Sequence, residues 1–107
     1  MLDPALFSRQ LTWADALGFV NQQVVVYVSA ASGVAEIPLD VQSVTESPSA
    51  PGTHQFAIWF KGPLNAPIEQ GTYQLRHSSL GDFAVFMTPT AKKTEGFFYE
   101  ACFSHVV

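Results

Sequence analysis

The stretch VAEIPLDVQSVTE, residues 34–46, decides the fold class of this chain. Ile37 and Leu39 fall on one side of an extended backbone, and Glu36 and Asp40 fall on the other. A period of two is typical of a strand with one face in a core and one face in water. The stretch therefore predicts a strand of an antiparallel sheet.

Pro38 lies on the polar side of this stretch. Proline has no backbone N–H to donate to a neighbouring strand, so it is confined to edge strands and bulges. We therefore expect the strand over residues 34–46 to be an edge strand or to contain a bulge.

Five more stretches are rich in β-branched and aromatic residues and lie between turn-forming residues. The six predicted strands cover residues 22–29, 34–46, 54–61, 72–77, 83–88 and 97–104. Gly81 lies in the connection between the fourth and fifth strands, where a positive φ is expected. The charged stretch 90–96 is predicted to be a mobile hairpin tip. Together these patterns predict a six-stranded antiparallel barrel or a two-layer sandwich.

The first 21 residues have a different pattern. Asp3 and Pro4 indicate a first turn of helix, and Thr12 and Asp15 indicate a capping box that begins a second turn, with Gly18 at its end. Both turns are too short to be stable alone. We expect residues 1–21 to form a helical N-terminal lid, part of the same domain as the antiparallel β region of residues 22–107.

Several predicted strands are apolar on both faces, which is more apolar surface than a domain of 107 residues can bury in one core. The N-terminal lid or another protein chain should cover the surplus. The candidate interface residues are Val25, Tyr27, Trp59 and Trp13. Trp59 either contacts the lid or anchors an interface, and we favour the lid. The strand over residues 22–29 lacks charge, proline or bulge signals, so it could pair with a second copy if it is an edge.

Composition excludes several classes of protein. The chain has five Lys and Arg residues and nine Asp and Glu residues, which gives a net charge of −4, and charged residues make up only 13% of the chain. Nucleic-acid binding needs more basic side chains than this, and disorder does not fit 48% apolar residues. Apolar runs such as 24–28 are far too short to span a membrane. No secretory signal is recognisable, so cytoplasmic localisation is the default expectation, with assembly outside the cell still open.

No catalytic, cofactor or metal site is predicted from the residues that could supply one. His54, His77 and His105 lack the spacing of a metal site. Cys102 is the single cysteine, which excludes an internal disulfide, and its apolar strand suggests a core position. Carboxylates such as Glu100 are scattered, so no acid–base pair is evident.

The chain also resembles a known family from about Leu11 to Ser104. The resemblance is carried by residues 11–12 (LT), 60–64 (FKGPL), 70–77 (QGTYQLRH), 80–81 (LG), 86–89 (FMTP) and 99–103 (YEACF). This family consists of small bacterial proteins catalogued only as a domain of unknown function. Its members are associated with genes for phage-tail-collar-like proteins, which implies an accessory or assembly role.

These observations lead to two main functional hypotheses. The first is a non-enzymatic structural or protein-interaction module of a bacterial or phage-tail-like assembly, which binds itself or another protein. The alternative is a barrel that binds a small apolar ligand in its interior, although aromatic side chains leave little room there. An enzyme is the third hypothesis, and a pocket with two or more titratable groups would favour it.

Overall fold

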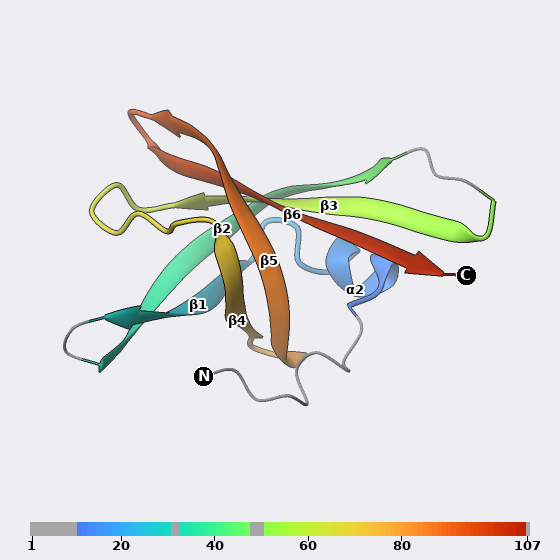
Figure 1. The fold of residues 1–107 in the computed structure, drawn as a ribbon, viewed down its shortest axis with the longest axis horizontal. Coiled ribbons are helices and arrows are strands. Elements are labelled where there is room, and N and C mark those ends of the chain that lie inside the picture. Colours follow the sequence, from blue (N-terminus) through green and yellow to red (C-terminus); the bar gives the residue numbers. More distant parts are fainter. Residues whose placement is uncertain (1–10, 31–32, 48–50, 107) are drawn as a thin grey trace.

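The computed structural model describes residues 11–30, 33–47 and 51–106 of the chain (Figure 1). The elements are α2 (Trp13–Leu17), β1 (Gln23–Ala30), β2 (Gly33–Ser47), β3 (Thr53–Gly62), β4 (Gly71–His77), β5 (Gly81–Lys93) and β6 (Gly96–Val106). The strands form a closed antiparallel barrel in the order β1-β2-β3-β6-β5-β4. The predicted fold class is confirmed, and pairing of β4 with β1 makes it a barrel rather than a sandwich. The predicted turn at Asp3 and Pro4 lies outside the described residues.

The core fills the inside of the barrel, because alternate residues of every strand point inward. Each strand contributes at least one side chain to this core. The largest fully buried side chains are Tyr99, Phe19, Phe56, Phe60, Phe83, Leu39, Ile58, Leu75, Met87, Val24, Val26 and Val41. Aromatic and branched side chains thus occupy the interior that a ligand-binding barrel would need to keep open.

The segment around α2 covers one end of the barrel. The helix begins with the predicted capping box, in which the Asp15 N–H donates to Thr12 Oγ1 over 3.1 Å and the Thr12 N–H donates to Asp15 Oδ2 over 3.3 Å. Gly18 caps the other end in a right-handed conformation, with φ −70°. The ring of Trp13 meets the edge of Phe56, and Phe19 is fully buried. The segment therefore packs on core side chains at the barrel mouth.

The loop between β3 and β4 closes the other end. Ile68 of this loop is buried, and its backbone N–H donates to the hydroxyl of Tyr99 over 2.9 Å. Gly62, where the loop begins, lies so close to Leu39 and Tyr99 that a Cβ there would contact both side chains. Both ends of the barrel are thus filled by side chains.

Neither of the two strands that the sequence suggested as candidate edges is an edge strand. Strand β2 pairs with β1 and β3; an edge or a bulge was expected there, and its register shift lies between Val41 and Ser43 rather than at Pro38. Pro38 is tolerated because the ladder with β3 begins only at Asp40. Strand β1 is not an edge either, because barrel closure pairs it with β4 over Val25–Tyr27.

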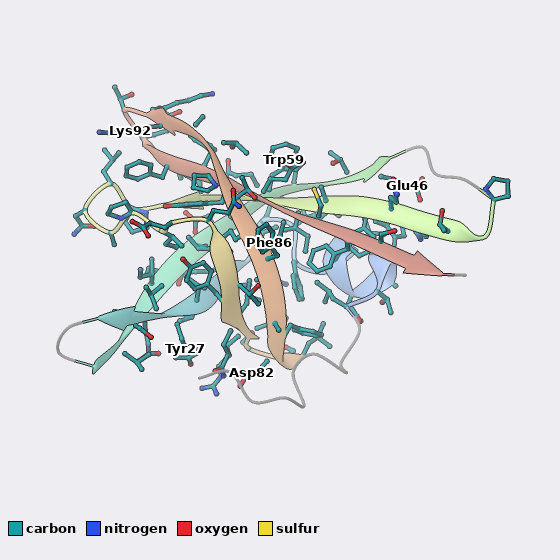
Figure 2. All side chains as sticks on the ribbon, in the orientation of Figure 1. Tyr27, Glu46, Trp59, Asp82, Phe86 and Lys92 are labelled. Carbon is teal, nitrogen blue, oxygen red and sulfur yellow. The ribbon has the colours of Figure 1, made fainter. Side chains whose placement is uncertain are left out.

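The turns follow the sequence more closely. Gly81 has φ 82°, as expected for the connection of β4 with β5. The stretch 90–96, by contrast, is mostly strand, because β5 continues to Lys93 and β6 starts at Gly96. This hairpin projects from the barrel, and Figure 2 shows Lys92 near its tip. Lysines of this hairpin make cation–π contacts with aromatic rings of β6. The Nζ atom of Lys92, for example, lies 5.5 Å from the ring centre of Phe97.

Candidate functional site

The outside of the barrel carries the surplus apolar residues that the sequence indicated. Phe86 is 51% exposed and Val34 is 69% exposed, and both point away from the core. Val25, Tyr27 and Trp59 are half-buried. Large apolar side chains at these positions contribute nothing to the core, so the outer surface is where a binding site is to be sought.

The two tryptophans have different surroundings. Trp59 is on the outside of β3, where its indole N–H donates to the hydroxyl of Thr45 on β2 over 3.0 Å. Trp13, the lid residue, packs instead against His54 and Phe56, whose rings are 5.7 and 5.6 Å away. The described part of the predicted lid, residues 11–21, packs on inward-pointing side chains, and residues 1–10 lie outside the described residues, so the contact of Trp59 with the lid stays a prediction.

Of the predicted interface residues, Tyr27 lines a groove on the outside of the barrel, at the junction of β1 and β4. The groove is open to solvent and has a volume of about 760 Å³. It is lined by Tyr27, Val28, Ser29, Val34, Pro67, Glu69, Thr72, Tyr73, Gln74 and Arg76. Val25 lies beyond its end, opposite Arg76. Phe86 lies next to its rim as the direct cross-strand neighbour of Thr72.

The groove exists because β1 and β4 separate. Their ladder consists of Val25, Val26 and Tyr27 opposite Arg76, Leu75 and Gln74. The same register would place Val28 opposite Tyr73, but no pair forms there between the described residues. The loop before β4 lies beside this opening and contributes Pro67 and Glu69 to its lining (Figure 1).

Polar contacts hold the closed end of the groove in place. The guanidinium of Arg76 donates to Asp82 from Nε and Nη2, over 2.7 and 3.0 Å, and Gln74 donates to the same carboxylate over 2.8 Å. The Asp82 carboxylate raises the pKa of Arg76, so this side chain stays charged. Arg76 also lies 5.3 Å from the ring centre of Tyr27, within range of a cation–π contact. Tyr27 and Asp82 are labelled on the same side of the molecule in Figure 2.

The open end of the groove is fixed by Tyr73. Its hydroxyl donates to the backbone carbonyl of Glu69 over 2.6 Å. Burial, and then the nearby Glu69 carboxylate, raise the pKa of Tyr73. The phenol is therefore neutral at physiological pH, and it acts as a hydrogen-bond donor that holds the loop against β4.

The histidines lie elsewhere. His77 is buried, stacks on Phe19 with ring centres 4.4 Å apart, and accepts the N–H groups of Ser79 and Leu80 at Nδ1. Since Nδ1 accepts, Nε2 carries the proton and donates to Gln22 over 2.5 Å. His54 pairs with Glu46 over 2.6 Å near the β2–β3 hairpin, and the register places His54 opposite His105. No cluster of metal-binding type forms among the described residues.

Cys102 is exposed, so the expectation of a core cysteine is wrong. It occupies an outward position of β6, opposite Ala57 of β3, while Ala101 next to it points inward. Partial burial raises the pKa of Cys102, and the charge and hydrogen bond of Glu100 raise it further. A thiol held in its neutral form is a weak nucleophile.

Sequence reasoning missed most of the groove, including Val34, Tyr73 and Arg76, and it missed the Asp82 carboxylate that holds Arg76. The pairing of β1 with β4 joins residues about fifty positions apart, and no local pattern encodes it. One signal was available, because Arg76 and Asp82 flank the connection between two predicted strands and lie opposite each other if those strands pair.

The described residues thus define a small closed antiparallel β-barrel with a filled interior and an open groove on its outside. The chain belongs to the family described as "Domain of unknown function (DUF6916)", which matches residues 11–103. No curated protein and no solved structure matches the chain. No helix among the described residues is long and apolar enough to cross a membrane.

Proposed function

We propose that this domain is a non-enzymatic protein-interaction module that binds another protein on the outside of its barrel. The groove at the junction of β1 and β4 is the observation that carries the proposal. A concave site of about 760 Å³ lies within the usual range for binding sites, roughly 300–1,000 Å³. Its lining combines apolar side chains such as Val28 and Val34 with a few fixed polar groups such as Arg76.

The outer surface next to the groove supports the same conclusion. Phe86 is half exposed beside the rim, and Val25 is half-buried beyond the closed end. Aromatic residues surrounded by polar neighbours are typical of protein interfaces. The resemblance to proteins associated with phage-tail-collar genes supports a role for this module in a bacterial or phage-tail-like assembly.

The alternative of a small apolar ligand inside the barrel has less support. Tyr99, Phe60 and Met87 are fully buried in the interior, which contains the densely packed core. The hypothesis of an enzyme has less support, although the groove does contain more than one titratable side chain, namely Tyr27, Glu69, Tyr73 and Arg76. Tyr73 and Arg76 are held in place by hydrogen bonds to the Glu69 carbonyl and the Asp82 carboxylate, and no histidine or cysteine is among the described lining residues.

Site-specific photocrosslinking tests the proposal. A benzophenone amino acid is placed at Val34, which is 69% exposed at the groove, and in a matched protein at Gln55, which is exposed on β3 across the barrel. In cells that naturally make the protein, we expect a discrete adduct from position 34 and none from position 55. The protein that forms the adduct is then purified, and its binding to the domain should weaken with Val34→Glu.

Two results would contradict the proposal. The first is the absence of any adduct at position 34 together with a mass by light scattering that stays monomeric over a hundredfold dilution. The second is equal adduct formation at both positions, because random collision does not distinguish the groove from β3.

A further inference from the structure

The separation of β1 from β4 leaves two strand edges facing each other across the groove. Residues Val28–Ala30 pair with β2, and residues Gly71–Tyr73 pair with β5. No ladder joins these two segments to each other. Each segment thus has one paired side and one side without a ladder partner among the described strands. Unpaired strand edges bind extended polypeptide through main-chain hydrogen bonds.

We propose that the groove binds a basic, extended segment of another protein, which is added as a strand at the open edge of β1 or β4. This inference rests on the proposed interaction function and specifies its partner. An edge of three residues is about 10 Å long at roughly 3.3 Å per residue. The incoming segment is therefore short, about three to five residues in contact with the barrel.

Side chains in the groove define what the incoming strand should carry. Val28 and Tyr73 are partly buried and pack against the core, so they form an apolar floor. Ser29 and Thr72 are exposed and occupy outward positions. Because strand side chains alternate, every second residue of the incoming segment contacts the floor, and we expect small or β-branched apolar residues there.

The charges around the groove favour a basic partner. Arg76 is already paired with Asp82. The carboxylates of Glu69, which lines the groove, and of Glu36, opposite Tyr27 on β2, form no ion pair within 4 Å among the described side chains, although Glu36 is near enough to help raise the pKa of Arg76. The single guanidinium of Arg76 thus faces the three carboxylates of Asp82, Glu36 and Glu69. The uncompensated charge is therefore negative. A second copy of this chain would bring the same rim and a net charge of −4, so repulsion disfavours self-association here.

Synthetic peptides test this inference directly. The probe is a fluorescein-labelled heptapeptide, Lys-Val-Lys-Val-Thr-Val-Lys with blocked ends, and the matched control replaces each lysine by glutamate. Fluorescence anisotropy should show binding of the basic peptide, weaker by about tenfold or more for the acidic one, because like charges oppose each other at the interface. A version with N-methylated amides at alternate positions, which cannot form the strand ladder, should lose its binding.

Variants of the protein then locate the binding site. Glu69→Lys should weaken binding of the basic peptide several-fold, whereas Glu95→Lys makes the same change of net charge on the distant β5–β6 hairpin and should have little effect. In a Cys102→Ser background, a disulfide-linked label on Ser29→Cys should block binding, and reduction should restore it. The same label on Gln55→Cys, on β3, should leave binding unchanged.

The outcomes separate this inference from the proposed function. Equal binding of basic and acidic peptides contradicts the basic partner, and binding that survives N-methylation contradicts strand addition, while either result leaves an interaction module possible by another mode. An adduct at position 34 that consists of two copies of this chain supports an interaction module but overturns the basic partner. The partner protein recovered by photocrosslinking at position 34 can also be tested with the labelled Ser29→Cys variant. If the label does not weaken its binding, the proposed binding site at the edge of β1 or β4 is wrong.

Discussion

Tyr99 is the residue that most clearly connects packing with a specific polar contact. Its ring is buried in the barrel, and its hydroxyl accepts the N–H of Ile68 in the loop beside the groove. Burial raises the pKa of Tyr99, an effect that outweighs the lowering by the Ile68 hydrogen bond. The phenol therefore stays neutral, and it fixes the loop that carries Pro67 and Glu69.

The first prediction concerns this hydrogen bond. Tyr99→Phe leaves the N–H of Ile68 buried without an acceptor, which should lower the free energy of unfolding by about 1–3 kcal/mol. Urea denaturation measures the change. Tyr73→Phe is the matched control, and it should cost less, because the carbonyl of Glu69 that it releases belongs to an exposed residue and can bind water. Equal losses for the two variants would contradict this account.

The second prediction concerns the reactivity of Cys102 as a function of pH. Burial and Glu100 raise its pKa, so the rate of alkylation by iodoacetamide should reach half its maximum at a pH above the ordinary midpoint of about 8.5. Glu100→Gln removes a negative charge and should move this midpoint down, although burial should keep it above the ordinary value. A midpoint that does not move, or moves up, would refute the role of Glu100.

At the scale of elements, the connection between β4 and β5 depends on one glycine. Gly81 has φ 82°, a conformation that β-branched residues rarely adopt. This turn sets the register of β4 against β5, which places Arg76 opposite Asp82. The polar contacts at the closed end of the groove thus depend on the turn.

The third prediction follows from that conformation. Gly81→Val should destabilise the domain by roughly 1–3 kcal/mol through backbone strain. Gly81→Asn should cost distinctly less, since asparagine tolerates a positive φ better than other residues with a side chain. Thermal unfolding of the two variants provides the comparison, and an unchanged midpoint for Gly81→Val would rule out strain at this position.

At the scale of the whole molecule, barrel closure separates an inner apolar set from an outer one. Val26 is fully buried, whereas Phe86, which is just as apolar, is half exposed on the outside. Because Val26 is buried, a lysine at this position tests the stability of the core. It would test association of β1 with a partner only if β1 were an exposed edge strand.

The fourth prediction compares these two positions. Val26→Lys places an unpaired charge in the core and should cost about 3 kcal/mol or more, enough to unfold much of the population. Phe86→Lys changes a side chain outside the core and should alter stability by about 0.5 kcal/mol or less. Thermal melting followed by circular dichroism distinguishes the two variants. A large loss of stability for Phe86→Lys would contradict the placement of Phe86 outside the core.

Local patterns in the sequence were sufficient for the number and approximate position of the strands, the capping box and the turn at Gly81, but not for the extension of β5 to Lys93. The alternation of apolar and polar residues predicts that Ile37 and Leu39 lie inside the barrel, as they do. A strand has only two faces, and its apolar face is the one that is buried. Thr12 and Asp15 are three residues apart, so their mutual hydrogen bonds need no distant partner. Both features depend on short-range geometry, which neighbouring residues determine.

The groove was decided only by the tertiary structure. Whether β1 is an edge depends on its pairing with β4, and that pairing stops after Tyr27 because the twisted strands separate as the barrel closes. The exposure of Cys102 and the position of Trp59 depend in the same way on which segment covers the outer face. Pairing between strands that are distant in the sequence gives no local signal. Residues 22–29 therefore predicted a strand, and only closure of the barrel determined which part of its edge has no ladder partner.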